Sequence, residues 1–437
     1  MIRRLRSGAL WTVKYQGADP FGGPVLKPMS VLKAMSILAW AKTSGYIDLF
    51  SAHDDDLLGW DPDDPEDYKN PKHPIHEELR AIKAVMDKAG LKMHMITCSL
   101  HGHPMFTAGG FTNRDAAIRV LAIKKALRCA WIGNFLGAEF ITYWVARDGF
   151  ESVVCVPSRR DNSPLEWLRQ ALNIISASCK ANRYTIKHGT IEPKCNEPRG
   201  AMYIALVGAA LALIATLDDP DFWGVNPEIP QHSAMGNQHP FLEVMHATDQ
   251  KKLFFLHIGG QIPGQFDDDF PTLVGEGQET MVLIFKYLDE IGWNGVIEFD
   301  CHALRSDLGY GLSEEEVEEI FKQFLAFNSL MYTLIEQVLV PRLMNNAMLA
   351  MALDDLDRPQ HSPPERLEKY AALLADPDPE NIAVLLATKV SVGGIQRWRQ
   401  DHLMVEFALK LALYGVDAAD LELLATTPGL LVGRDGK

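Results

Sequence analysis

The stretch Thr190-Ile191-Glu192-Pro193-Lys194-Cys195-Asn196-Glu197-Pro198-Arg199 follows a short apolar run, so we expect it at the carboxyl end of a buried strand. Residues two apart in an extended chain face the same side, which places Glu192 and Lys194 together. Two prolines stiffen the segment and remove backbone donors. A carboxylate beside an ammonium suits a metal ligand next to a group that polarises a carbonyl. The plainer alternative is an ordinary ion pair in a surface loop.

The composition is that of a globular protein and disfavours nucleic acid as a partner. The 437 residues suffice for one large α/β domain and a second region. A hydrophobic content of 47% with 23% charged residues excludes a disordered chain. The formal net charge is -15, whereas nucleic-acid binding needs a basic face.

The cysteines and the apolar runs predict a cytoplasmic protein that does not enter a membrane. Six scattered cysteines without C-x-x-C spacing indicate reduced thiols rather than a zinc or redox motif. The basic start, Met1 to Arg6, lacks the apolar segment of a signal peptide. We also expect no membrane span, because no apolar run reaches the ~18 residues that a span needs.

Short apolar runs alternate with helical patterns over the first ~335 residues, which predicts an α/β fold. The expected strands are Ala9–Val13, Tyr46–Ser51, Lys92–Cys98, Phe140–Trp144, Thr185–Ile191, Phe222–Val225, Leu253–His257 and Gly295–Asp300. The expected helices are Val31–Thr43, Pro74–Lys88, Arg114–Phe135, Pro164–Asn182, Tyr203–Leu217, Phe241–Ala247, Glu276–Ile291 and Ser313–Val338. Eight such units indicate a (β/α)8 TIM barrel with a C-terminal helical extension. A doubly wound open sheet is the alternative, but no G-x-G-x-x-G follows the first strand.

The pattern changes near residue 340, so we divide the chain into a barrel catalytic domain, 1–338, and a helical C-terminal arm, 339–437. The arm contains proline breaks at Arg358-Pro359 and Ser362-Pro363-Pro364 and gives no strand signal. The helices of such an arm have apolar faces but no sheet of their own to cover, so these faces need another protein surface to pack against. We expect it to pack on a neighbouring subunit.

The active site of a barrel enzyme lies at the carboxyl ends of its strands, and here those ends carry acids and imidazoles. The residues in question are Trp11, His53 to Asp56, His101, His103, Trp144, Glu192, Lys194, Glu228, His232, His257, Asp267 to Asp269, Asp300 and His302. Oxygen-rich clusters with one or two imidazoles suit magnesium, manganese or cobalt. The carboxylates suffice for two divalent metal ions.

In combination these motifs resemble the xylose (glucose) isomerase family, as a divergent member, over about residues 8 to 335. The resemblance rests on seven segments: Leu10–Gly22, His53–Asp56, His103–Thr112, Ile191–Arg199, Gly224–Glu228, Asp267–Asp269 and Phe299-Asp300. It implies an isomerase with two divalent ions that is a homotetramer or dimer. Its C-terminal arm would wrap a partner subunit.

The resemblance also implies a role for each matching residue. His53, oriented by Asp56, would assist opening of the cyclic sugar, and Lys194 would hold the aldehyde oxygen. Hydride would then shift between C2 and C1. The pocket walls and the metal ligands follow from the same match. Trp11, Trp144 and His101 would line the pocket, Phe21 would reach into a neighbouring site, and Glu192, Glu228, His232, His257, Asp267, Asp269 and Asp300 would bind metal.

Several positions depart from the family pattern. His257 replaces a carboxylate ligand, which makes the first metal site softer and favours manganese, cobalt or another transition metal. Gln231 stands where the family has its histidine ligand, and His232 is our preferred replacement. His101 replaces a phenylalanine, His302 a lysine and Cys195 a proline. Glu298 shares a strand face with Asp300 and adds an inward carboxylate.

The resulting hypothesis is a xylose isomerase that converts D-xylose to D-xylulose, or D-glucose to D-fructose. No phosphate-cradling loop is recognisable, so the expected ligand is a free aldose or ketose. Three alternatives stay open. They are a related sugar isomerase or epimerase with a shifted substrate, a metal-dependent endonuclease on the same barrel, and a non-catalytic sugar-binding barrel with decayed metal sites.

Overall fold

The chain divides into two compact units, Met1–Ile335 and Glu336–Lys437. The sequence placed this boundary after residue 338. A computed structural model describes residues 3–15, 21, 27–157, 162–229, 238–262, 264, 269–272, 274–275, 278–303, 311–357, 364–375, 378–389 and 395–415.

The first unit is a closed barrel of parallel strands. They are β1 (Arg6–Ala9), β2 (Leu49–His53), β3 (Lys92–Thr97), β4 (Phe140–Trp144), β6 (His188–Glu192), β8 (Trp223–Val225), β9 (Glu228–Ile229), β10 (Phe255–Ile258) and β11 (Val296–Phe299). The hydrogen-bonded order is β8-β6-β4-β3-β2-β1-β11-β10-β9. The ring closes where Val225 bridges Leu253 in parallel register. The predicted (β/α)8 barrel is therefore confirmed and the open-sheet alternative is wrong, because closure removes both sheet edges.

The sixth barrel strand consists of two short pieces, β8 and β9. Pro227 lies between them, and proline cannot donate a hydrogen bond to a neighbouring strand. The first piece pairs with β6, and the second pairs with β10 through Glu228 and His257. The break allows the sixth strand to pair with β6 through its first piece and with β10 through its second. It also explains why the apolar run that predicts this strand is short.

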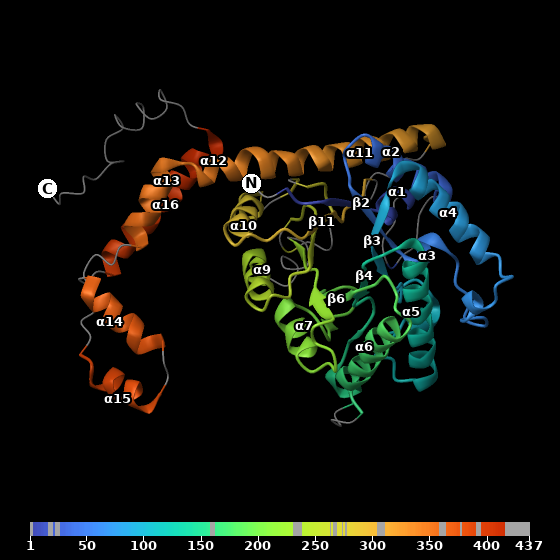
Figure 1. Cartoon of the computed structure of the whole chain (residues 1–437), viewed down its shortest axis with the longest axis horizontal. Coiled ribbons are helices and arrows are strands. Elements are labelled where there is room, and N and C mark those ends of the chain that lie inside the picture. The colour runs from blue at the N-terminus through green and yellow to red at the C-terminus, as the bar shows by residue number, and fades with distance from the viewer. Residues whose placement is uncertain are drawn as a thin grey trace. The chain divides into compact units, whose positions relative to one another are not determined.

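Helices follow the strands and surround the barrel (Figure 1). They are α2 (Val31–Thr43), α4 (Ile75–Ala89), α5 (Ala116–Leu136), α6 (Pro164–Ala181), α7 (Val207–Ile214), α9 (Pro240–Asp249), α10 (Gln278–Glu290) and α11 (Glu314–Leu334). The buried residues of these helices are spaced three or four apart, so they lie on one face. On α4 they are Ile75, Leu79, Ile82 and Met86. Most predicted helix bounds agree within two residues, but α7 is shorter than the predicted Tyr203–Leu217.

The first strand lies earlier than the sequence predicted. β1 ends at Ala9, and the apolar run that follows is a helix, α1 (Leu10–Lys14), rather than a strand over Ala9–Val13. Short, fully buried runs do not distinguish a strand from a helix by periodicity. Similarly, β2 is shifted toward its carboxyl end relative to the prediction, so its last residue is His53.

Short elements fill the loops of the barrel. They are α3 (Asp54–Leu57), the 3-10 turns η1 (Asp67–Lys69), η2 (Pro104–Phe106) and η3 (Val153–Cys155), and an antiparallel pair, β5 (Gly149–Phe150) with β7 (Ala201–Met202). The pair β5–β7 ties the loop after β4 to the loop after β6. These two loops carry residues of the candidate site.

The second unit is helical throughout its described residues. It contains the π-helix η4 (Ile335–Leu339), α12 (Val340–Met344), α13 (Ala347–Asp357), α14 (Pro364–Ala375), α15 (Pro379–Ala387) and α16 (Ile395–Tyr414). Helices α13 and α16 pack together around buried Leu349, Ala408 and Leu409. By contrast, Leu374 on α14 and Leu386 on α15 are 75% and 82% exposed. Packing of this unit on a neighbouring subunit stays a prediction.

One helix within the described residues, Glu314–Met344, has the length and apolar character of a membrane span. We expected no such segment. Its first part is α11, which buries Val317, Phe321 and Leu325 within the protein. The core helix of a soluble protein meets the same criteria, so a single helix of this kind is weak support for a membrane span.

Replacing Phe255 by alanine tests the barrel core. Phe255 is fully buried on β10 and packs with Ala9, Trp11 and Met95. We expect Phe255→Ala to lower the free energy of unfolding by roughly 3–5 kcal/mol, because it removes buried apolar surface and leaves a cavity. Urea denaturation measures this loss. The control Val154→Ala, at an 86% exposed position, should change it by less than about 0.5 kcal/mol. Equal losses in both variants would contradict the assigned core.

Candidate active site

Three side chains at the ends of three barrel strands converge at the carboxyl end of the barrel, with Glu192 and His257 buried and Asp300 partly buried. Glu192 is the last residue of β6, His257 lies in β10, and Asp300 follows β11. Each offers one ligand atom, and these atoms lie within 4.8 Å of one another. The Nδ1 atom of His257 is 2.9 Å from Asp300 Oδ2 and 3.5 Å from Glu192 Oε2. All three residues were predicted from the sequence to be metal ligands.

The electrostatics of this cluster favour a positive charge between the two carboxylates. Burial alone lowers the pKa of His257, but Glu192, Asp300 and Glu298 outweigh it, and the pKa is raised well above its ordinary value. Burial raises the pKa of Asp300, yet His257 and the Trp11 indole reverse this effect and hold the pKa at about 2. Two carboxylates this close repel each other unless a cation lies between them.

The chemistry of the donor set fits a divalent metal ion. The Nδ1 atom of His257 is buried and makes no hydrogen bond to any residue in the described part of the chain. It faces the carboxylates, so a cation that displaced the proton from this nitrogen would receive its lone pair. Two carboxylates and one imidazole suit manganese, cobalt or another transition metal. Glu192, His257 and Asp300 could therefore hold one ion.

Neighbouring donors fix the orientation of both carboxylates. The Trp11 indole N–H donates to Asp300 Oδ1 at 2.8 Å, and the Asn226 amide donates to Glu192 Oε2 at 2.8 Å. Trp11 is in this position because α1 begins directly after β1. Asn226 lies at the break between β8 and β9. Carboxylates held in this way are preorganised for metal binding.

His53 and Asp56 form a pair beside the cluster. His53 ends β2 and caps α3, and its backbone N–H donates to Asp56 Oδ2 at 2.9 Å. The same oxygen lies 3.1 Å from His53 Nδ1. Burial lowers the pKa of His53, but the facing Asp56 carboxylate outweighs it, so the pKa is raised. The ring of His53 lies 4.5 Å from the Trp11 ring, whose indole N–H binds Asp300, so this pair lies beside the carboxylate–histidine cluster.

Lys194 lies among aromatic rings, and its neighbour Trp144 also contacts the ring of His53. Its Nζ atom is 4.1 Å from the centre of the Trp144 ring and 2.6 Å from Glu197 Oε1. The His101 ring packs edge-on against Trp144 at 4.8 Å and lies 5.5 Å from His53. Burial, with smaller contributions from His53 and Lys194, lowers the pKa of His101 well below its ordinary value. His101 is therefore a neutral group that can accept or donate one hydrogen bond.

Phe21 lies in the pocket of its own chain, whereas the sequence resemblance implied that it would reach into a neighbouring site. Its ring stacks on Trp144 with the centroids 5.7 Å apart. The guanidinium of Arg147 lies 4.8 Å from the Phe21 ring centre, and Lys194 lies 5.2 Å from it. Stacking and two cation–π contacts hold the ring here.

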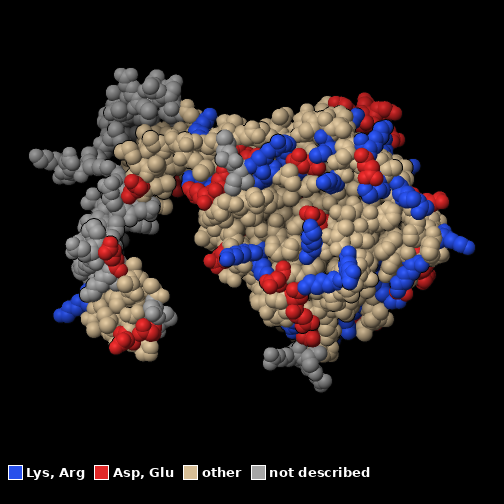
Figure 2. Space-filling view, viewed as in Figure 1, with Lys and Arg blue, Asp and Glu red and all other residues tan. Residues whose placement is uncertain are grey.

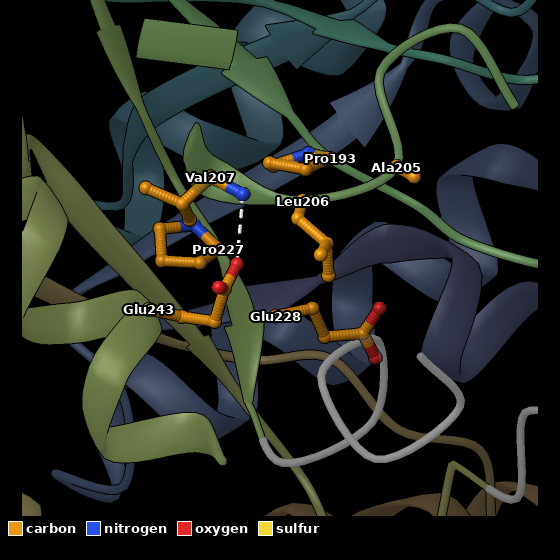
Figure 3. Close-up of a pocket in the computed structure, with 7 residues that line it drawn as sticks. All are labelled: Pro193, Ala205, Leu206, Val207, Pro227, Glu228 and Glu243. Atoms are coloured by element: carbon orange, nitrogen blue, oxygen red, sulfur yellow. Dashed lines mark hydrogen bonds between the residues drawn. The ribbon is translucent and has the colours of Figure 1, made fainter. Parts of the chain in front are cut away.

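The residues expected at a second metal are only partly described. Glu228 is buried on β9 in register with His257, and it lines a pocket with Pro193, Val207 and Glu243. Figure 3 shows the Glu243 carboxylate accepting from the Val207 N–H while the Glu228 carboxylate points away from it. Asp269 Oδ2 lies 3.6 Å from His302 Nε2. Gln231, His232 and Asp267 lie outside the described residues, so the second site stays a prediction.

Comparison with known proteins places this barrel among its relatives. Residues 39–323 match the family described as xylose isomerase-like TIM barrel. The chain belongs to this family. Within it, the chain is 34% identical over 300 residues to a xylose isomerase of Thermus caldophilus, covering 68% of this chain and 72% of that protein. The xylose isomerase of Thermus thermophilus is 33% identical over the same shares.

Solved structures share the family fold at much lower identity. An L-ribulose 3-epimerase aligns with a TM-score of 0.52 and 14% identity, over 83% of this chain and 100% of that chain. A D-allulose 3-epimerase from Methylomonas sp. aligns with a TM-score of 0.51 and 13% identity, over 77% and 99%. At such identities the similarity establishes the fold alone.

Sequence reasoning missed residues that support the site of this family member. Lys125, buried on α5, pairs with Asp54 and with Asp55, the latter at 2.8 Å. The three consecutive aspartates after His53 therefore have different partners, and only Asp56 faces the histidine. A lysine in a helical pattern is normally solvated, so the sequence carried no signal for this role.

Asp148 was also missed as a structural centre. It follows β4, is buried, and accepts hydrogen bonds from the Gly110 N–H at 2.9 Å, from Thr112 and from the Tyr143 hydroxyl at 2.7 Å. These bonds fasten the loop after β3 to the loop after β4. The motif Gly109-Gly110-Phe111-Thr112 was noticed, but its partner could not be derived from sequence spacing.

Replacing Asp56 by asparagine tests the electrostatic coupling to His53. The carboxylate raises the pKa of His53 against the effect of burial, so its removal should leave burial dominant. We expect Asp56→Asn to lower the pKa of His53 below the ordinary value of about 6.5. Histidine ring titration by NMR measures it. The exposed control Asp63→Asn should leave the pKa unchanged, and an unchanged pKa in Asp56→Asn would refute the coupling.

Proposed function

We propose that this chain is a metal-dependent aldose–ketose isomerase that interconverts D-xylose and D-xylulose, with D-glucose and D-fructose as a related pair. Family membership and the xylose isomerase relatives support sugar isomerase or epimerase chemistry. One observation carries the narrower proposal. The cluster of Glu192, His257 and Asp300 lies at the barrel end that also carries Lys194 and the His53–Asp56 pair.

The proposed cofactors are two divalent ions, magnesium, manganese or cobalt. Glu192, His257 and Asp300 would hold the first, and Glu228 would bridge to a second that Asp267, Asp269 and His232 complete. Such ions act as Lewis acids on the neighbouring sugar oxygens and so assist transfer of hydrogen between C1 and C2. His257 supplies a nitrogen where oxygen would suit magnesium best, so manganese or cobalt is the better expectation for the first ion.

His53 acts in opening the cyclic sugar. Its Nδ1 is held by Asp56, which leaves Nε2 to carry a proton to the ring oxygen. Asp56 stabilises the imidazolium before transfer, as the raised pKa requires. The Trp11 ring against His53 fixes the direction of the imidazole. The acyclic aldehyde is the form on which hydrogen transfer between C1 and C2 takes place.

Lys194 binds the carbonyl oxygen of the open sugar. Glu197, which is fully buried, pairs with its ammonium group and keeps it charged inside the pocket. Trp144, Phe21 and Trp11 present apolar faces to the sugar carbons and exclude water. A fixed positive charge in a dry pocket is worth far more to a developing negative oxygen than one in solvent.

The proposed partners are a free sugar and further copies of the chain. Acidic and basic side chains alternate over the barrel face in Figure 2 rather than forming one basic surface, which supports a small-molecule substrate over nucleic acid. The exposed apolar residues Leu374 and Leu386 support assembly into a dimer or tetramer through the second unit. The proposed location is the cytoplasm, as the scattered, reduced cysteines indicate.

A shifted substrate or an epimerisation is the second candidate. His101 favours it, because a neutral imidazole beside His53 and Trp144 offers a hydrogen bond to a sugar hydroxyl that an apolar ring could not. A pocket that hydrogen-bonds a hydroxyl discriminates strongly against a sugar without it. Product analysis distinguishes the two candidates, since isomerisation moves the carbonyl group whereas epimerisation inverts one carbon.

Metal removal and reconstitution test the proposed reaction. We expect the chelator-stripped protein to be inactive and to recover conversion of D-xylose to D-xylulose with manganese or cobalt, followed by NMR of the products. Stripped protein refilled with calcium is the control for nonspecific ion effects. Conversion of another aldose or ketose, but not xylose, would support the second candidate. Metal binding with no conversion in a panel of free aldoses and ketoses would refute both.

Replacing Lys194 by methionine tests the carbonyl-binding role. Methionine keeps most of the side-chain volume but removes the charge, so we expect kcat to fall by about 10²–10³-fold with metal content unchanged. Steady-state kinetics and elemental analysis measure the two quantities. The matched control Lys187→Met changes an exposed lysine paired with Glu139 and should leave kcat unaltered. Normal kcat in Lys194→Met would remove Lys194 from the mechanism.

A further inference from the structure

A buried carboxylate, Glu298, lies behind the metal-ligand candidates and is not used by the mechanism above. It is fully buried inside the barrel on β11, in register with His257 on β10 and with Ser7 on β1. Side chains at one register of neighbouring parallel strands form one interior layer of the barrel. A carboxylate in such a layer costs stability unless it has polar partners.

The polar contacts of Glu298 form a line that ends at the ligand cluster. The Ser51 hydroxyl donates to Glu298 Oε2 at 2.7 Å, and the Ser7 hydroxyl lies 3.1 Å from Ser51. The same Oε2 atom lies 3.6 Å from His257 Nε2, on the opposite side of the ring from the atom that faces Asp300. The second oxygen, Oε1, makes no hydrogen bond to the described residues.

The two ring nitrogens of His257 therefore face different groups. Nδ1 faces Asp300 and Glu192, and Nε2 faces Glu298. The Asn226 amide nitrogen also lies 3.4 Å from Nε2; one of its two N–H groups donates to Glu192 at 2.8 Å, and the other is left for the longer contact with Nε2. A hydrogen bond to a carboxylate is roughly twice as strong as one between neutral groups. Carboxylates thus face both ring nitrogens, and an ion bound at Nδ1 would leave the ring proton on Nε2, where Glu298 is the charged partner.

We propose that Glu298 is a positioning residue that holds the proton of His257 on Nε2 and leaves the Nδ1 lone pair directed at a metal ion bound by Glu192 and Asp300. The inference rests on the metal-binding part of the proposed function. At 3.6 Å the two groups are in ion-pair range and farther apart than a hydrogen bond, so the proposal requires them to approach when the ion binds. A carboxylate behind a histidine ligand fixes the tautomer and raises the basicity of the ligand. Ser51 and Ser7 in turn hold the carboxylate.

The decisive experiment compares Glu298→Gln with the wild-type protein in cobalt binding. Glutamine keeps the size but loses the charge, so we expect cobalt affinity to fall by about 10- to 100-fold in calorimetry. The visible absorption bands of bound cobalt should also change, because the ligand geometry relaxes. In the magnesium-loaded protein, ring nitrogen shifts in NMR should report one His257 tautomer for the wild type and a mixture for Glu298→Gln.

Two further variants keep the test conclusive. Ser51→Ala leaves the charge but removes the hydroxyl that holds it, and should weaken cobalt binding by a smaller factor. It decides the question if Glu298→Gln does not fold. Glu139→Gln, which changes an exposed carboxylate, should bind cobalt as the wild type does. Wild-type affinity, spectrum and tautomer in a folded Glu298→Gln, or unchanged affinity in Ser51→Ala when the former is unfolded, would overturn the proposal.

Failure of the sugar chemistry gives a different result from failure of this inference. If no sugar is converted but Glu298→Gln weakens cobalt binding, the proposed reaction falls and the positioning role stands. If xylose is converted and Glu298→Gln binds cobalt normally, the reaction stands and the positioning role falls. A wild-type protein that binds no divalent ion refutes both.

Discussion

The convergence of Glu192, His257 and Asp300 at the carboxyl end of the barrel is the constraint on which the rest of the site depends. The buried Glu192 carboxylate and the partly buried Asp300 carboxylate meet one imidazole, and a positive charge between them relieves their repulsion. Three strands must be held in a fixed register to bring these side chains together, and barrel closure supplies that register. The charge cluster therefore depends on the closed barrel, because only the fixed strand register holds the three side chains together.

Around this cluster each functional side chain has a structural partner. Trp11 and Asn226 orient the carboxylates, Asp56 orients His53, and Glu197 pairs with Lys194. Such partners lower the conformational freedom of the functional side chains. Residues at the ends of rigid barrel strands are thereby held in fixed positions. The polar line of Ser7, Ser51 and Glu298 extends the same arrangement into the barrel interior.

Much of the fold was predictable because amphipathic helices and buried strands leave periodic patterns. The strand Phe140–Trp144 and the helix Val31–Thr43 agree with the structure in both bounds. The first strand did not, because an apolar run that is buried on all sides is equally compatible with a strand and a short helix. The consequence is local but functional, since α1 is what brings Trp11 to Asp300.

The sequence by itself determined the barrel, the approximate positions of most strands and the kinds of groups that their ends carry, because these depend on local patterns of polarity. It placed Glu192, His257 and Asp300 at strand ends on the same face of the barrel. Only the tertiary structure decided which groups touch: Lys125 on Asp54, Glu197 on Lys194, Phe21 on its own chain's Trp144, and Glu298 behind His257. Each of these contacts depends on the direction and burial of its two side chains. Sequence spacing predicts such directions within one helix or strand, but not between residues of different elements.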